Sequence, residues 1–217
     1  MCEPLDSGVG EGDVAFAGLH PWKFLAPNMV EADDVCGTAQ KAIEGLRERL
    51  KASSRLGVGE IGLDRLKERT ISAAMRSAFI RQLELAAEFG RPAVLHGAKC
   101  WGEVVAACRT RKGRIPAFLF HGFSRSGGLI PDIIDLNGFI SIGPALLNDH
   151  AVNYRELAKT IPAGRILVES DATAENAQTV AKVDEIAGKL AEIRGVPFEE
   201  LEKTLEENAT RFTESLI

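Results

Sequence analysis

The sequence lacks the features that would assign it to a membrane, secreted or strongly basic class of protein. No segment approaches the roughly 20 apolar residues that a membrane-spanning helix needs. Residues 1–13 have neither the basic start nor the apolar run of a signal peptide. Acidic residues outnumber basic ones by 31 to 26, which gives a formal net charge of −5. We therefore expect a cytoplasmic protein without a broad basic face for nucleic acid, which holds any phosphate substrate through a metal or a few cationic side chains.

Paired cysteines are also missing. Cys2, Cys36, Cys100 and Cys108 form no Cys-x-x-Cys motif, so they predict reduced thiols rather than a disulfide framework. Cys100 and Cys108 are spaced along one expected helix, which favours a place in the core. With 45% hydrophobic and 26% charged residues, the composition is that of an ordinary globular protein. The length of 217 residues predicts one domain over 1–217, of which 1–13 form an irregular N-terminal segment.

Strand-like and helical segments alternate along the chain. Six short apolar segments have strand character, near residues 14–19, 56–61, 93–96, 116–121, 138–142 and 166–170. Seven segments have helical character, near residues 35–51, 71–89, 101–108, 129–136, 154–160, 176–194 and 198–212. This alternation predicts an α/β fold with a parallel sheet. A closed (β/α) barrel has eight strands, so we expect a barrel that is incomplete at the N-terminus.

Five of these segments deliver a metal-ligating residue type at or near their ends, namely His20, Glu60, His96, His121 and Asp171. A carboxylate that ends a buried strand needs a cation or a donor, because its desolvation is costly. In a closed barrel the carboxyl ends of the strands share one mouth. Oxygen and nitrogen ligands without a thiolate suit Mg²⁺, Mn²⁺ or Zn²⁺. We therefore expect Glu60, His96, His121 and Asp171 to bind one or two divalent ions that activate water for hydrolysis.

Catalytic and substrate-binding roles are expected at the same mouth. Glu60 can bridge two ions, and Asp171 can bind an ion or accept a proton from the attacking water. Lys99 and Arg125 lie on loops that follow two of the strands and can hold a phosphate oxygen. His20 suits a substrate wall as well as a ligand, and we assign it with Lys99 and Arg125 to substrate binding.

Two further acids have more than one reading. Asp64 is either a residue at the rim of the site or the cap of a turn. Glu169 either faces the barrel interior or makes a hydrogen bond to a ligand residue.

Several motifs together carry a family resemblance: Gly-Leu-His-Pro-Trp at 18–22, Gly-Glu-Ile-Gly-Leu-Asp at 59–64, Phe-His-Gly-Phe-Ser at 120–124, Gly-Phe-Ile-Ser-Ile-Gly at 138–143 and Leu-Val-Glu-Ser-Asp at 167–171. In order and spacing they resemble the TatD family of metal-dependent hydrolases. The resemblance implies a TIM-like barrel of the amidohydrolase type, a centre of one or two metals, and deoxyribonuclease activity. It also implies that Glu60 is the bridging glutamate, that His96 and His121 are the later histidines, and that Asp171 is the aspartate of the centre.

The chain departs from the family pattern in three places. It has no His-x-His motif, which supplies two ligands in the family. Ala172-Thr173-Ala174 stands where Ser-Pro-Tyr is usual, and Lys99 replaces the usual arginine. These differences suggest a compact branch of the family.

The leading functional hypothesis is a metal-dependent phosphodiesterase that acts on DNA or a smaller phosphate ester. One alternative is amide or lactone hydrolysis, since a fold does not fix its chemistry. The other is a degenerate binding protein that holds at most one weak metal. If the opening strands are absent, the exposed edge of the first strand would favour a partner chain.

Overall fold

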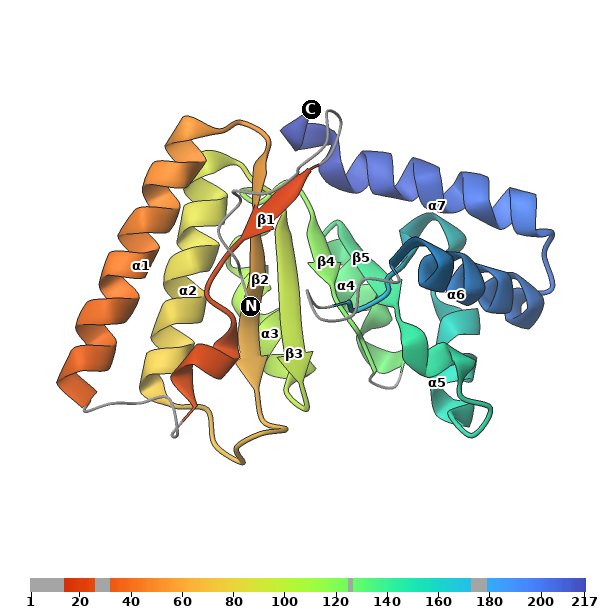
Figure 1. Cartoon of the computed structure of the whole chain (residues 1–217), viewed down its shortest axis with the longest axis horizontal. Helices are drawn as coiled ribbons and strands as arrows, with labels where there is room; N and C mark the ends of the chain where they lie inside the picture. Colours follow the sequence, from red (N-terminus) through yellow and green to blue (C-terminus); the bar gives the residue numbers. More distant parts are fainter. Residues whose placement is uncertain (1–13, 26–31, 125–126, 173–178) are drawn as a thin grey trace. The chain divides into compact units, whose positions relative to one another are not determined.

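The computed structural model describes residues 14–25, 32–124, 127–172 and 179–217 (Figure 1). The chain divides into two compact units. The first comprises Met1–Phe118 with Thr213–Ile217, and the second comprises Leu119–Phe212. Each unit contains short parallel strands and packed helices, as the alternating sequence pattern predicts.

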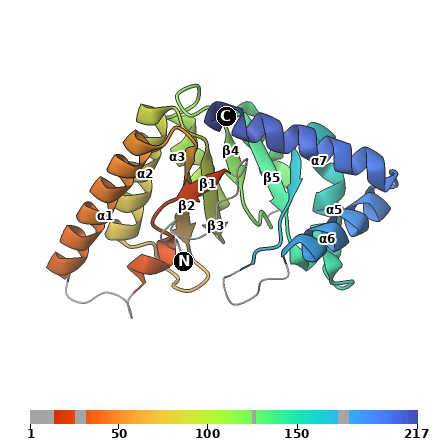
Figure 2. The same cartoon turned by 45° about the horizontal axis from the view of Figure 1, so that its top comes forward.

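The first unit is built on three parallel strands in chain order. Helices α1 and α2 lie side by side on one side of β2, and α3 packs on β3 (Figures 1 and 2). Its elements are β1 (Ala15–Ala17), the 3₁₀ turn η1 (Pro21–Phe24), α1 (Ala32–Ala52), β2 (Leu56–Asp64), α2 (Ala73–Phe89), β3 (Ala93–Ala98) and α3 (Trp101–Arg109).

The second unit continues this alternation with shorter strands. Strands β5 and β6 pair in parallel, with Ile140 opposite Ile166. Its elements, with those at its boundaries, are β4 (Phe118–Phe120), η3 (Gly127–Leu129), α4 (Ile130–Asp135), β5 (Gly138–Ile142), η4 (Pro144–Leu147), α5 (Val152–Thr160), η5 (Ala163–Arg165), β6 (Ile166–Val168), α6 (Thr179–Arg194), α7 (Phe198–Thr213) and η6 (Glu214–Leu216).

Helix α7 anchors strand β6 through a buried amide. The side chain of Asn208 donates to the carbonyl oxygens of Ala163 (2.7 Å) and Ile166 (2.8 Å). Phe212 of the same helix packs edge-on against Phe139 of β5, with ring centroids 5.8 Å apart. The hydrogen bonds therefore fix the start of β6, the strand that precedes Glu169 and Asp171, and the aromatic contact fixes the neighbouring β5.

Helix α2 has defined signals at both ends. The Ser72 hydroxyl accepts the backbone N–H of Met75 at 3.1 Å and caps the N-terminus. Gly90 ends the helix in the left-handed conformation at a φ of 60°, which glycine adopts without the strain that a Cβ introduces. Pro92 follows, and β3 begins at Ala93. The chain therefore turns sharply enough to place β3 beside β2.

Two strands are longer than the sequence predicts. Strand β2 continues past Glu60 to Asp64, and β3 continues past His96 to Ala98. Glu60 and His96 therefore lie within paired strands. The prediction that each of them ends its strand was wrong. The physical reason is that Ile61 and Leu63 are buried and extend the apolar face of β2 beyond Glu60.

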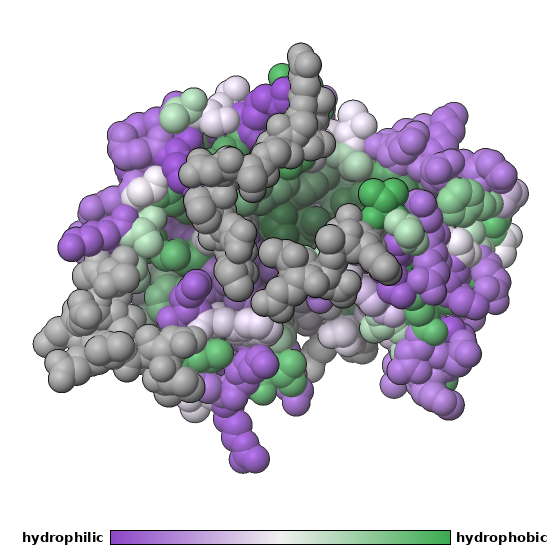
Figure 3. Space-filling model, viewed as in Figure 1, coloured by the Kyte–Doolittle hydropathy of each residue, from purple (hydrophilic) through white to green (hydrophobic). Residues whose placement is uncertain are grey.

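The core and surface follow the composition. Cys100 and Cys108 are buried free thiols, which confirms their predicted place in the core, and Cys2 and Cys36 lie outside the described side chains. Hydrophilic residues cover much of the surface over the outer helices of each unit (Figure 3). Among the described residues, no helix combines the length and the apolar character needed to cross a membrane.

Candidate metal centre

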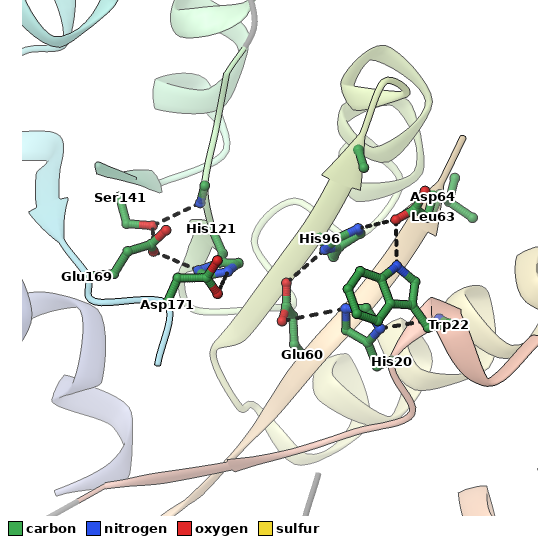
Figure 4. A network of polar contacts seen from close by, with 12 residues as sticks. His20, Trp22, Glu60, Leu63, Asp64, His96, His121, Ser141, Glu169 and Asp171 are labelled. Atoms are coloured by element: carbon green, nitrogen blue, oxygen red, sulfur yellow. Dashed lines mark hydrogen bonds and ion pairs between the residues drawn. The ribbon is translucent and has the colours of Figure 1, made fainter. Parts of the chain in front are cut away.

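The register between β2 and β3 places the imidazole of His96 between the carboxylates of Glu60 and Asp64. Gly62 stands opposite His96 in the parallel pairing. Side chains two residues apart on a strand point to the same face, so Glu60 and Asp64 flank this position on the face that His96 also occupies. His96 Nδ1 lies 3.0 Å from Glu60 Oε1, and His96 Nε2 lies 2.9 Å from Asp64 Oδ2 (Figure 4).

Glycine at position 62 allows this close approach. A Cβ at position 62 would overlap the carbonyl oxygen of His96, and the φ of 156° is one that other residues rarely adopt. Gly59 has a related role, since a Cβ there would lie 2.7 Å from the Cβ of Val94. The glycines of the motif therefore position the carboxylates by letting the two backbones come together.

Asp64 is a buried carboxylate with several donors. Its Oδ1 accepts the backbone N–H groups of Leu66 (2.6 Å) and Lys67 (3.0 Å), and its Oδ2 accepts the indole N–H of Trp22 (2.7 Å). Burial alone would raise the pKa of Asp64, but these hydrogen bonds and the one from His96 outweigh it and hold the pKa below its usual value. Asp64 is therefore ionised and accepts the Nε2 proton of His96. The turn-cap reading of Asp64 is correct, and the reading as a residue at the rim of the site stays a prediction that its contact with His96 supports.

His96 is oriented by this contact. With Nε2 as the donor to Asp64, Nδ1 faces Glu60. Burial would lower the pKa of His96, but the hydrogen bonds and negative charges of Glu60 and Asp64 raise it overall. The pair of carboxylates therefore favours a positive charge at this place, either the imidazolium proton or a metal ion.

His20 approaches the same carboxylate from η1. Its Nδ1 accepts the backbone N–H of Trp22 at 3.2 Å, and its Nε2 lies 3.7 Å from Glu60 Oε2. Burial lowers the pKa of His20 to about 4, with partial compensation by the charge of Glu60. His20 is therefore neutral and carries its proton on Nε2. Binding an ion through Nε2 requires the other tautomer, and with it the loss of the hydrogen bond from Trp22.

The three residues fit a divalent ion by their donor set. One ligand atom from each of His20, Glu60 and His96 lies within 4.8 Å of the other two. Two atoms bound about 2.1 Å from one ion in tetrahedral geometry are about 3.4 Å apart. His96 Nδ1 lies 3.0 Å from Glu60 Oε1 and His20 Nε2 lies 3.7 Å from Glu60 Oε2, so each imidazole is close to that spacing from one of the two carboxylate oxygens. Two imidazoles and one carboxylate leave further coordination positions for water or substrate.

Gln82 positions His20 from helix α2. Its side chain is fully buried, its Oε1 accepts the Leu19 N–H at 2.6 Å, and its Nε2 donates to the Leu19 carbonyl at 3.3 Å. We predict that Gln82→Leu lowers the free energy of unfolding by about 2 kcal/mol, because a partly buried backbone N–H loses its partner. It should also weaken metal binding, since the backbone before His20 is no longer held.

Urea unfolding and a metal titration check this prediction. Gln40→Leu is the matched control, because Gln40 is exposed on α1 and makes one side-chain contact, to Glu44. Equal stability and metal affinity in the two variants would contradict the role of Gln82.

A second polar cluster lies in the second unit. Glu169, directly after β6, accepts from His121 Nδ1 at 2.6 Å and also from the hydroxyl of Ser141 on β5 (Figure 4). The other ring nitrogen of His121, Nε2, lies 3.4 Å from Asp171 Oδ1. Glu169 therefore holds His121 with Nδ1 as the donor and leaves Nε2 toward Asp171, the arrangement found for metal-binding histidines. The hydrogen-bond reading of Glu169 is correct.

Asp171 borders a cavity. It has the left-handed φ of 49°, and its side chain is 71% exposed. A cavity of about 420 Å³ lies beside it, lined by Pro144, Ser170, Asp171, Ala172, Ala181, Lys182 and Glu185. The carboxylate is therefore accessible to solvent and to a bound molecule.

The predicted site residues fall into these two clusters. Glu60 and His96 are in contact in the first unit, and His121 and Asp171 are in contact in the second. That all four share one site stays a prediction from barrel topology. Lys99 is exposed after β3 with a left-handed φ of 56°, and Arg125 lies outside the described residues.

Asp64 gives a second test of the centre. Asp64→Asn removes the charge and can donate an N–H to His96 Nε2, which forces the imidazole proton onto Nδ1, toward Glu60. We predict a metal affinity about 10- to 100-fold lower. Isothermal titration with Mn²⁺ or Zn²⁺ measures it, with Asp184→Asn on α6 as an exposed control. A wild-type affinity in Asp64→Asn would show that Asp64 does not orient His96.

These features define an α/β protein with a candidate metal centre on its parallel strands. The chain belongs to the TatD related DNase family, whose model matches residues 9–214. This confirms the resemblance seen in the sequence motifs.

Among curated proteins, the chain is similar to two kinds of relative. It is 30% identical over 159 residues to the 3′-5′ ssDNA/RNA exonuclease TatD of Edwardsiella piscicida, covering 73% of this chain and 57% of that protein. The chain thus spans little more than half the length of that exonuclease. It is 24% identical over 214 residues to the uncharacterized metal-dependent hydrolase YabD of Bacillus subtilis, covering 94% and 79% of the two chains.

Solved structures establish the fold. The TatD homolog YJJV from Escherichia coli matches with a TM-score of 0.74 at 21% identity, over 92% of this chain and 76% of that one. An uncharacterized amidohydrolase from Saccharomyces cerevisiae matches with a TM-score of 0.69 at 15% identity, over 91% and 79%. The prediction of a TIM-like α/β fold is confirmed.

Proposed function

We propose that this protein is a metal-dependent hydrolase that cleaves phosphodiester bonds, with nucleic acid as the substrate. The observation that carries the proposal is the convergence of His20, Glu60 and His96 in a chain of the TatD family. The names of two relatives, an ssDNA/RNA exonuclease and a metal-dependent hydrolase, support the same reaction class.

His20, Glu60 and His96 would hold a divalent ion, which would lower the pKa of a bound water and stabilise negative charge at the phosphate. Glu60 presents one carboxylate oxygen toward each imidazole and so fixes the arrangement. Asp64 accepts a hydrogen bond from the Nε2–H of His96, the ring nitrogen that does not face Glu60. In the second unit, His121 would bind an ion, and the exposed carboxylate of Asp171 would accept the proton of an attacking water. In the first unit, Lys99 would contact a phosphate oxygen.

The donor set also bears on the identity of the ion. Two imidazoles beside one carboxylate suit Zn²⁺ or Mn²⁺ better than Mg²⁺, which prefers oxygen ligands and retains its waters. We propose Mn²⁺ or Zn²⁺ at the first unit's cluster. A second ion would use the oxygen-rich surroundings of His121, where Glu169 and Asp171 lie.

The test is an assay of the purified chain with a labelled single-stranded DNA and with a small phosphodiester, each with Mg²⁺, Mn²⁺ or Zn²⁺. Cleavage should depend on the added ion and stop with a chelator. Glu60→Ala, which removes the central carboxylate, is the control for contaminating nucleases. If the wild type cleaves neither substrate faster than Glu60→Ala, the proposal is wrong. Release of a carboxyl product from amides or lactones, without phosphodiester cleavage, would select the alternative chemistry.

A further inference from the structure

Trp22 is an exposed aromatic residue that is nevertheless held in place. It is 44% exposed, while its indole N–H donates to Asp64 Oδ2 at 2.7 Å and its backbone N–H donates to His20. Its ring stands edge-on to His20, with centroids 4.9 Å apart, and lies 6.4 Å from the ring of His96 (Figure 4). The indole is thus fixed immediately beside the candidate metal centre.

Packing does not account for this exposure. The other tryptophan, Trp101, is 3% exposed and covers Gly97, where it serves the core. Within the described part of the chain, Trp22 is the one aromatic among the large exposed apolar side chains, which are Trp22, Leu66, Val152, Val180 and Ile217. A rigid, partly exposed aromatic ring next to the candidate metal centre is what a stacking ligand requires.

Lys67 adds a positive charge to this surface. Its Nζ lies 4.7 Å from the centroid of the Trp22 ring, and its backbone N–H is bound to Asp64 Oδ1 at 3.0 Å. The Asp64 carboxylate therefore fixes both the indole and the turn that carries the ammonium group. In a chain with a formal charge of −5, a local cation beside an aromatic ring provides the means to hold a base and its phosphate together.

We propose that Trp22 and Lys67 form a subsite for one unpaired nucleobase and its attached phosphate, next to the metal centre. The base takes the place of the Lys67 ammonium group over the indole face, and the displaced ammonium group pairs with the phosphate. Paired bases cannot present a face to the indole, so this subsite selects single strands or frayed ends. The inference rests on the proposed function, because it assumes a nucleic-acid substrate.

The test measures binding to a phosphorothioate strand of about ten thymidines, which resists cleavage and matches the length of known single-strand sites. A strand with the same backbone but without bases is the probe for stacking. Because Trp101 is buried, quenching of tryptophan fluorescence on binding reports Trp22. Titrations are run with and without Mn²⁺ on the full chain.

We expect the thymidine strand to quench the fluorescence and to bind more tightly than the base-free strand. Trp22→Leu should lower the affinity for the thymidine strand by about 5- to 100-fold and bring the ratio of the two affinities close to one. Trp22→Phe keeps an aromatic face without the N–H donor, so it should retain most of that ratio. Lys67→Gln should reduce the slope of log affinity against log salt by about one, whereas Lys41→Gln on α1 should leave it unchanged.

Three results would overturn the subsite: no binding of the thymidine strand, equal affinity of the wild type for both strands, or an unchanged ratio in Trp22→Leu. An unchanged ratio includes an equal loss of affinity for both strands in Trp22→Leu, which would mean that Trp22 acts only through Asp64. Failure of the subsite can be distinguished from failure of the proposed function. Base-dependent binding without cleavage would refute the hydrolase alone, and cleavage without a role for Trp22 would refute the subsite alone.

Discussion

Replacing Glu60 with glutamine is expected to lower kcat/KM for phosphodiester cleavage by about a thousandfold or more. Among the residues that the structure describes, Glu60 is the one carboxylate that faces both His20 and His96, at 3.7 and 3.0 Å. Glutamine has nearly the same shape, so the fold should persist. The amide, however, carries no charge to offset a divalent ion, and a thousandfold loss corresponds to about 4 kcal/mol of transition-state stabilisation.

The measurement is steady-state cleavage together with the bound metal content. Glu44→Gln on α1 is the matched control, because it makes the same chemical change on an exposed helix of the same unit. Thermal unfolding of both variants should resemble that of the wild type. A loss of less than about tenfold in Glu60→Gln would remove Glu60 from the metal centre, because loss of a ligand charge costs more than the 1.4 kcal/mol that tenfold represents.

The elements were predictable because their signals are local. Ser72 and Gly90 mark the two ends of α2, and the apolar run before Glu60 marks β2. The motif around residue 60 also predicted which residues would carry chemistry, since a carboxylate between glycines in a buried strand needs a partner. Composition and pattern were sufficient for the class of fold, and they predicted the types of the candidate ligand residues.

The pairing of side chains was not predictable in the same way. Asp64 and Glu169 had two readings each, because their partners His96 and His121 lie far away in sequence. One signal was present: Glu60, Gly62 and Asp64 alternate with the apolar Ile61 and Leu63, so a longer β2 places all three on one face. The register that sets Gly62 opposite His96 depends on an irregularity between Val58 and Ile61, which no sequence pattern specifies.

The same register makes Gly62→Ala the most damaging small substitution expected in the first unit. The new Cβ would overlap the His96 carbonyl oxygen, and both atoms belong to paired backbones that cannot rotate away. We expect the free energy of unfolding to fall by about 3 kcal/mol or more, the upper range for overpacking. Because β2 and β3 must separate, the contacts of His96 with Glu60 and Asp64 lengthen together, and metal affinity should fall by at least about 100-fold.

Comparison with Gly90→Ala separates the steric overlap at position 62 from the cost of placing alanine at a positive φ. Gly90 also has a positive φ, 60°, but a Cβ there has no neighbour within 4 Å, so its substitution should cost only about 1 kcal/mol and leave metal binding intact. Urea unfolding and metal titration of both variants give the comparison. If Gly62→Ala behaves like Gly90→Ala in both measurements, β2 and β3 do not approach as closely as the centre requires. The positioning of His96 by backbone contact would then be wrong, and its orientation would depend on Asp64 alone.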